Sequence, residues 1–156
     1  MRKLITAIAM GALAGGLVAA PSALAVKAPK PVSGTVTVVP TPTTITPTTT
    51  TVAVEGNVAA NSSCRKDRTV HFSYVNADTL VVTPLAETAV TGSNGDYTAV
   101  LPKPADAAPA SVILRATVDQ VTRKVGSAKK GKKDKKGRQF NCLELTGDSA
   151  PLTVSP

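Results

Sequence analysis

The sequence predicts an all-β fold, a small antiparallel β-sandwich of about seven strands, from three observations. Apolar and polar residues alternate with a period of two in short runs, the pattern of strands with one buried face. Proline and glycine interrupt the chain so often that no segment after residue 25 keeps a helical period. Threonine and valine, which branch at Cβ and favour strands, are abundant, whereas the chain has two Phe, two Tyr and no Trp. The core is therefore expected to consist of Val, Leu, Ile and Ala.

Residues 1–25 have the layout of a cleavable signal peptide. A short basic head, Arg2-Lys3, precedes an uncharged apolar run that Pro21 ends, and the small residues of Ala23-Leu24-Ala25 follow. The run is rich in Ala and Gly and ends at a cleavage signature, so a signal peptide is favoured over a membrane anchor. We expect cleavage near Ala25, a secreted or extracellular protein, and no transmembrane segment after cleavage.

Residues 26–51 are expected to form a disordered Thr/Pro-rich linker ahead of the folded domain. The low-complexity segment Pro40–Thr51 has little apolar surface to bury, and its prolines favour an extended spacer. Its threonines also offer acceptors for O-glycosylation. Alternation within residues 33–39 leaves open a short edge strand there. The β-sandwich domain is expected to span residues 52–156.

Strand-like runs follow one another through the expected domain. An Asn-Gly pair at Asn94-Gly95 provides the clearest turn, because these residues accept positive φ at low cost and suit a tight hairpin. The runs expected as strands are Val52–Val58, Arg68–Val75, Thr79–Thr83, Glu87–Thr91, Asp96–Leu101, Ser111–Val118, Gln139–Thr146 and Ala150–Val154.

Two of these segments resemble a known family. Thr91–Pro102 runs a threonine into an Asn-Gly turn and an aromatic-led strand that ends at a proline, and Val54–Val58 looks like an opening glycine-containing strand. In both, the chain is similar to the carboxypeptidase regulatory-like family of prealbumin-type, immunoglobulin-like (Ig-like) sandwiches. The resemblance covers roughly residues 52–118, without the cysteines or the basic segment. It implies a non-catalytic appendage or cell-surface domain of a secreted bacterial protein, some relatives of which bind carbohydrate, and it carries over no ligand residue.

The cysteines, Cys64 and Cys142, are predicted to form a disulfide. An even number of cysteines in an exported chain favours a bridge, and this pair is too far apart for a CxxC redox motif. Two sulfurs and one histidine are also too few for a structural zinc site. On the chain-entropy model, a closed loop of this length stabilises a fold by about 4–5 kcal/mol.

The formal charge of +8 is concentrated in residues 123–138, which hold nine Lys or Arg against Asp134 alone. Without Arg2 and Lys3, which leave with the signal peptide, the chain carries +6, so everything outside this segment sums to −2. Glycines and like charges disfavour a helix, and the segment is predicted to be a mobile basic loop between the last strands. The candidate anion-binding residues are Arg123, Lys124, Lys129, Lys130, Lys132, Lys133, Lys135, Lys136 and Arg138.

Two interpretations of this loop stay open. In the first, the loop attracts an anionic partner, namely a cell-envelope polymer, a polysaccharide or lipid head groups. In the second, the loop is a solvated insertion without a partner. Because no aromatic residue or ordered groove accompanies the lysines, sequence-specific nucleic-acid binding is not expected.

No pattern in the sequence predicts catalysis, a metal or a cofactor. The single histidine, His71, falls on the solvent-facing side of its predicted strand, and the chain has no GxSxG nucleophile elbow and no calcium-loop pattern. Asn61-Ser-Ser63 matches the N-glycosylation triplet. The predicted function is a secreted non-catalytic β-sandwich module with a structural or surface-interaction role. The alternative is an extracellular polyanion-binding protein that acts through the loop 123–138, and an enzyme is the third class considered.

Overall fold

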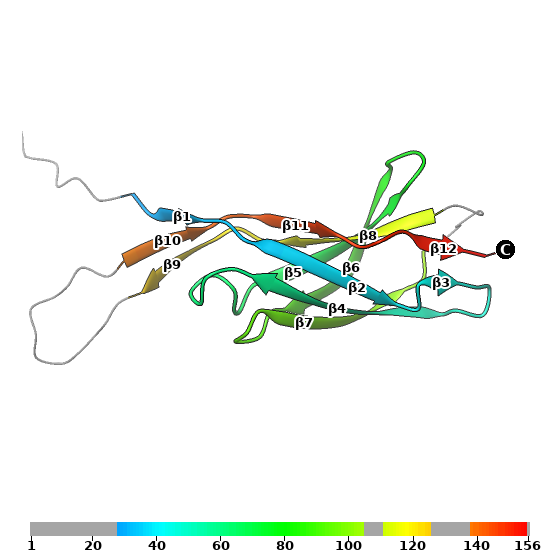
Figure 1. The fold of residues 1–156 in the computed structure, drawn as a ribbon, viewed down its shortest axis with the longest axis horizontal. Coiled ribbons are helices and arrows are strands. Elements are labelled where there is room, and N and C mark those ends of the chain that lie inside the picture. The colour runs from blue at the N-terminus through cyan, green and yellow to red at the C-terminus, as the bar shows by residue number, and fades with distance from the viewer. Residues whose placement is uncertain (1–27, 105–110, 126–137, 156) are drawn as a thin grey trace, which may run out of the picture.

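The computed structural model describes residues 28–104, 111–125 and 138–155, and every helix or strand in these ranges is a β-strand (Figure 1). The predicted all-β class is therefore confirmed, with more strands than the seven expected. The predicted signal peptide lies outside the described residues. The twelve strands are β1 (Lys30–Val32), β2 (Thr35–Thr41), β3 (Thr44–Ile45), β4 (Thr51–Ala59), β5 (Thr69–Asn76), β6 (Val82–Val90), β7 (Asp96–Pro102), β8 (Ser111–Val118), β9 (Val121–Val125), β10 (Arg138–Cys142), β11 (Leu145–Asp148) and β12 (Leu152–Val154).

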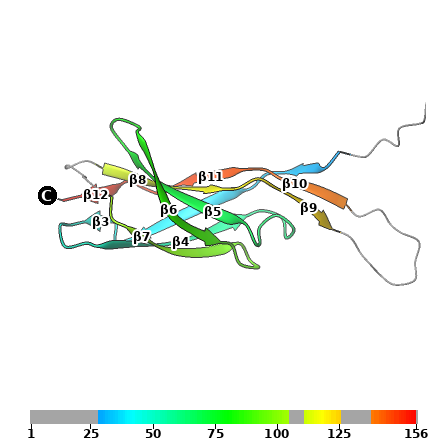
Figure 2. The same ribbon diagram turned by 180° about the vertical axis from the view of Figure 1, so that it is seen from behind.

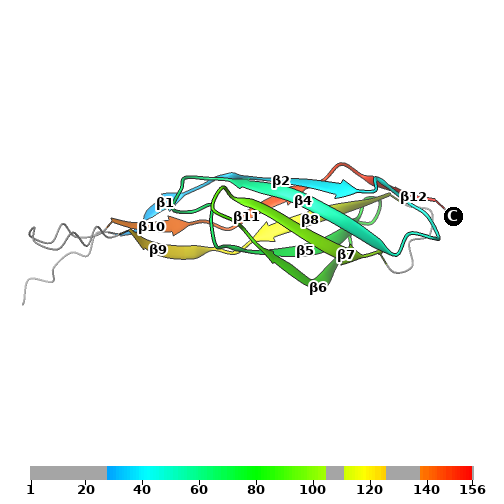
Figure 3. The ribbon, with the colours of Figure 1, turned by 90° about the horizontal axis from the view of Figure 1, so that it is seen from below.

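Two of the three sheets face one another and enclose the core (Figures 1 and 3). The small sheet has the order β2-β4-β7, and the large sheet has the order β3-β12-β8-β5-β6, with β11 also paired to β8. Within these two sheets, every strand pair is antiparallel except β3 with β12. Valine and leucine from both sheets fill the interior, as the composition predicts, and Phe72 and Tyr97 add an aromatic pair at 6.0 Å between ring centroids.

The sheets approach each other closely along one side. A Cβ at Gly147 of β11 would run into the backbone oxygen of Val36 on β2, so only glycine permits this approach. On the opposite side, the turn at Asn94-Gly95 is present, and Gly95 has a φ of +93°. This turn connects β6 of the large sheet to β7 of the small sheet, so it is not a hairpin between two paired strands.

The segment 26–51 does not form a linker ahead of the domain where the structure describes it. β2 pairs with β4 over its whole length, and β3 pairs with β12. Val38 and Ile45 are buried in the core. In β2 the side chains of Val36, Val38 and Pro40 face inward to different degrees, while those of Thr35, Thr37, Val39 and Thr41 face solvent. The Thr/Pro-rich composition made the segment resemble a spacer despite this alternation. The edge strand left open for residues 33–39 is present as β2, and the domain begins well before Val52.

The third sheet, with the order β1-β10-β9, forms an extension that we call the arm. The chain passes from β8 into β9 through Asp119 and Gln120, and returns from β10 into β11 through Leu143 and Glu144. β1 then pairs in parallel with β10. Figures 1 and 2 show the arm reaching beyond the two facing sheets, at the end of the molecule opposite to β12. The single strand expected over Gln139–Thr146 is thus two strands, one in the arm and one in the large sheet.

Candidate functional site

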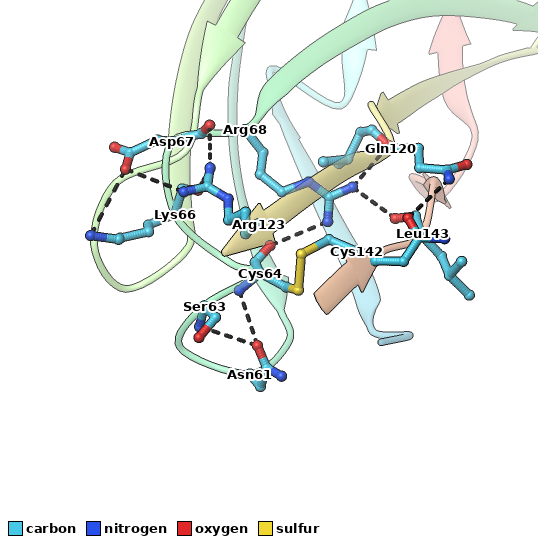
Figure 4. Close-up of a disulfide and its surroundings, with 12 residues drawn as sticks. Asn61, Ser63, Cys64, Lys66, Asp67, Arg68, Gln120, Arg123, Cys142 and Leu143 are labelled. Carbon is cyan, nitrogen blue, oxygen red and sulfur yellow. Dashed lines mark hydrogen bonds and ion pairs between the residues drawn. A yellow bond between two sulfur atoms is a disulfide. The ribbon is translucent and has the colours of Figure 1, made fainter. Parts of the chain in front are cut away.

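A disulfide fastens the base of the arm, as the sequence predicted. Cys142 ends β10, Cys64 lies in the loop between β4 and β5, and their Cα atoms are 5.4 Å apart. Both residues are fully buried. The side-chain oxygen of Asn61 accepts hydrogen bonds from the backbone N–H groups of Ser63 and Cys64 at 3.1 and 3.0 Å, and this local turn places Cys64 against the arm (Figure 4).

A buried arginine provides a second fastening beside the disulfide. Arg68 is only 2% exposed, and its guanidinium donates hydrogen bonds to backbone oxygens of Cys64 at 3.2 Å, Leu143 at 2.7 Å and Asp119 at 3.0 Å from Nε (Figure 4). These oxygens belong to the β4–β5 loop and to the two junctions between the large sheet and the arm. Burial, and then the charge of Arg123, lower the pKa of Arg68, while Asp119 opposes them.

Arg123, one of the candidate anion-binding residues, provides the third fastening. Its Nη2 donates hydrogen bonds to the backbone oxygens of Lys66 and Asp67 at 2.7 and 2.8 Å, and its Nη1 lies 3.8 Å from the Asp67 carboxylate. Its side chain is 23% exposed and its Nε is buried. The sequence placed Arg123 and Lys124 in a loop, but both lie in β9, and the Arg123 guanidinium binds the protein itself.

The other candidate residues divide into two groups. Lys124 and Arg138 are exposed on β9 and β10. The lysines of the central part lie outside the described residues: Lys129, Lys130, Lys132, Lys133, Lys135 and Lys136.

Lys30 is a further cation of the arm that no sequence pattern predicted. It lies on β1 in register with Phe140 of β10, and Phe140 is in turn in register with Arg123 of β9. No local sequence pattern reports a pairing between segments so far apart. The three strands of the arm carry Lys30, Arg123, Lys124 and Arg138 and no carboxylate.

His71 lies on the solvent-exposed side of β5, where the alternation placed it. Its Nε2 is 3.0 Å from the carboxylate of Asp119, and both side chains are about half exposed. In the part of the chain that the structure describes, no group of three or more His, Cys, Asp or Glu residues could hold a metal ion.

Comparisons with known proteins add no family: no protein-family model, no curated protein and no solved structure matches this chain. The similarity to carboxypeptidase regulatory-like domains stays a prediction from the sequence.

Proposed function

We propose that this protein is a secreted, non-catalytic interaction module, in which the β-sandwich supports the arm as its contact surface. The observation that carries the proposal is the triple fastening of the arm by the disulfide, Arg68 and Arg123. No residue of the arm belongs to the hydrophobic core, and a three-stranded sheet needs a hydrophobic face or packing against another element to be stable by itself. Residues that fix the arm to the body therefore support a role for the arm itself.

The disulfide also supports an extracellular location, because disulfides persist in oxidising compartments. Within the described ranges, no helix has the length and apolar character needed to cross a membrane. Export through the signal-like segment 1–25 remains part of the proposal. An Ig-like assignment of the sandwich likewise belongs to the proposal, on the strength of the two segments that resemble the family.

The test is binding of the purified protein to isolated cell envelopes from the organism that makes it. The arm variant carries Lys30→Gln, Lys124→Gln and Arg138→Gln, and the control carries Lys103→Gln, an exposed cation that follows β7 outside the arm. We expect the parent and the control to bind equally and the arm variant to bind less. Equal binding of all three proteins would show that the arm is not the contact surface. If none of them binds, the interaction role fails.

A second candidate function, binding of an anionic polymer, is favoured by the charge of the arm. All charged residues in its three strands are Lys or Arg. The lysine-rich residues 126–137 follow β9 directly in the sequence. A polymer that exchanges its counterions for these side chains would bind with an affinity that falls as salt concentration rises. Replacing Lys129, Lys130, Lys132, Lys133, Lys135 and Lys136 by Ser should reduce both affinity and salt dependence. Unchanged binding at low salt would mean that this segment is only an insertion.

A further inference from the structure

We infer that the face of the arm around Phe140 binds an acidic polysaccharide, with the ring of Phe140 against a sugar ring and the neighbouring cations against its carboxylates. This inference rests on the proposed polyanion-binding function and specifies the partner. It uses only described residues of the arm.

One face of the arm combines an aromatic ring with several cations. Residues in register on neighbouring strands point to the same side of a sheet, and so do residues two apart on one strand. Lys30, Phe140 and Arg123 are in register across β1, β10 and β9, and Arg138 lies two residues before Phe140. One face therefore presents an aromatic ring on the central strand, with a cation on either side and a third further along.

The groups on this face differ in how accessible they are to a ligand. Arg123 already donates hydrogen bonds to backbone oxygens of the β4–β5 loop, so it fixes one border of the face. Lys30 and Arg138 are exposed, and Phe140 is partly exposed. Val125, opposite Arg138 in the register, is 46% exposed and extends the apolar surface of this face.

The spacing between Phe140 and the exposed cations matches the size of a sugar ring. Neighbouring strands lie about 4.8 Å apart and alternate residues about 7 Å apart along a strand, which sets Lys30 and Arg138 about one sugar ring from Phe140. A sugar acid offers an apolar C–H face together with a carboxylate on the same ring. An aromatic face packs against the first, and a cation pairs with the second.

Other anionic partners match this face less well. A flexible phosphate polymer has no ring for Phe140, and a lipid surface would favour aromatic residues at an exposed tip rather than in the central strand of a sheet. Single-stranded nucleic acid supplies rings and charge, but its binding proteins stack successive bases on several aromatic residues. Phe140 is the only aromatic residue in the three strands of the arm.

The test compares four soluble or dispersed probes at matched charge and low salt: polygalacturonate, polyphosphate, single-stranded DNA and vesicles of phosphatidylglycerol. We expect the parent protein to bind polygalacturonate most tightly. Phe140→Leu should lose about fivefold to tenfold in affinity for polygalacturonate and leave polyphosphate binding unchanged. Phe140→Tyr, which keeps the ring, should retain the parent affinity and keeps the test valid if the leucine variant is poorly folded. Lys30→Gln with Arg138→Gln should weaken binding to polygalacturonate more than Lys103→Gln does.

The outcomes separate the inference from the function on which it rests. All variants keep residues 126–137, so attraction by those lysines is common to every measurement. Salt-dependent binding of polyphosphate and polygalacturonate with equal affinity, unaffected by Phe140→Leu, overturns the polysaccharide inference and leaves polyanion binding standing. Preference for DNA or for vesicles also overturns it. Absence of binding to all four probes overturns both.

Discussion

The hydroxyl of Tyr97 donates a hydrogen bond to the backbone oxygen of Thr37 at 2.7 Å, although their strands, β7 and β2, do not pair with each other. The side chain crosses beneath β4 at Gly56, the residue in register with Tyr97. A Cβ at Gly56 would run into the end of the Tyr97 ring and the Thr37 oxygen. The Tyr97 side chain thus links all three strands of the small sheet, and it can cross β4 because Gly56 has no side chain.

Replacing Gly56 with Ala should therefore destabilise the fold by about 2–4 kcal/mol, through overpacking and loss of the hydrogen bond. Tyr97→Phe should cost only about 1 kcal/mol, because it removes the hydrogen bond alone. Denaturant unfolding measures both. The control is Gly92→Ala, where the nearest atom to a new Cβ would be 3.6 Å away. If Gly56→Ala and Gly92→Ala cost the same, the crossing does not constrain the sheet.

The two tyrosines should ionise late. Burial raises the pKa of Tyr97 to about 12, and burial followed by the charge of Glu87 raises the pKa of Tyr74 to about 12, from an ordinary value of 10.0. The folded protein then keeps both phenol protons above pH 10. Their contribution to stability is complete below about pH 10 and is lost as the pH rises toward about 12.

Near-ultraviolet absorbance of phenolate can follow this titration directly, because the chain has two Tyr and no Trp. We expect a midpoint close to 12 while the protein remains folded, and one close to 10 in denaturant. A folded-state midpoint near 10 for either residue would show that its ring is not buried as described.

Arg68→Met should destabilise the protein by about 3 kcal/mol, because it leaves several backbone oxygens at the base of the arm without a donor. Arg68→Lys should not restore the loss, since one ammonium group cannot reproduce the planar fork that reaches three segments. Arg65→Met is the control: among the described residues, the Arg65 side chain makes one hydrogen bond, to the Ser93 oxygen at 3.1 Å, and its loss should cost at most about 1 kcal/mol.

Hydrogen exchange should show where the Arg68 variants are weakened. We expect amides of β9 and β10 to exchange faster, while amides of β4 and β7 keep their protection. Parent-like exchange in the arm of Arg68→Lys would mean that the disulfide and Arg123 suffice to hold it.

Leu80→Asn should stabilise the fold by about 0.5–1 kcal/mol. Leu80 has a φ of +58° and is 71% exposed, so it occupies a left-handed conformation without burying its side chain. Asn tolerates this conformation better than a branched apolar residue does. Thermal unfolding measures the gain. Val81→Asn, at a neighbouring residue that is 60% exposed and has no positive φ, should bring no comparable gain. Equal changes in stability for Leu80→Asn and Val81→Asn would mean that the loss of an exposed apolar side chain, and not the left-handed conformation of Leu80, causes the effect.

Sequence patterns predict the parts of this fold that have one buried face and one exposed face. β4, β5, β7 and β8 alternate clearly and occur where alternation places them. β2 alternates too, but its threonines and Pro40 resemble the composition of a spacer, and β3 is only two residues long. The charged residues of β9 resemble those of a loop. β9 forms a strand because it pairs with β10, and not because one of its faces packs into the core.

The candidate site shows the same limits. The disulfide could be predicted because two cysteines in an exported chain leave few alternatives. The role of Arg68 could not be predicted, because its guanidinium donates hydrogen bonds to backbone oxygens. Every residue has a backbone oxygen, so no residue type in the sequence marks the acceptors. The position of Lys30 beside Phe140 depends on strand pairing between the two ends of the domain, which is a property of the fold alone.

The disulfide also determines how the molecule would respond to tension. The arm and β12 lie at opposite ends, so a force applied through the two ends of the described chain is transmitted along the long axis (Figure 1). Cys64 and Cys142 are 78 residues apart in sequence, and their covalent link would withhold about 260 Å of extensible chain from the load. Under oxidising conditions, the stretched protein would therefore form a short connection between its two ends. Reduction would convert it into a long one, and the difference in extension is a direct single-molecule measure of the bond.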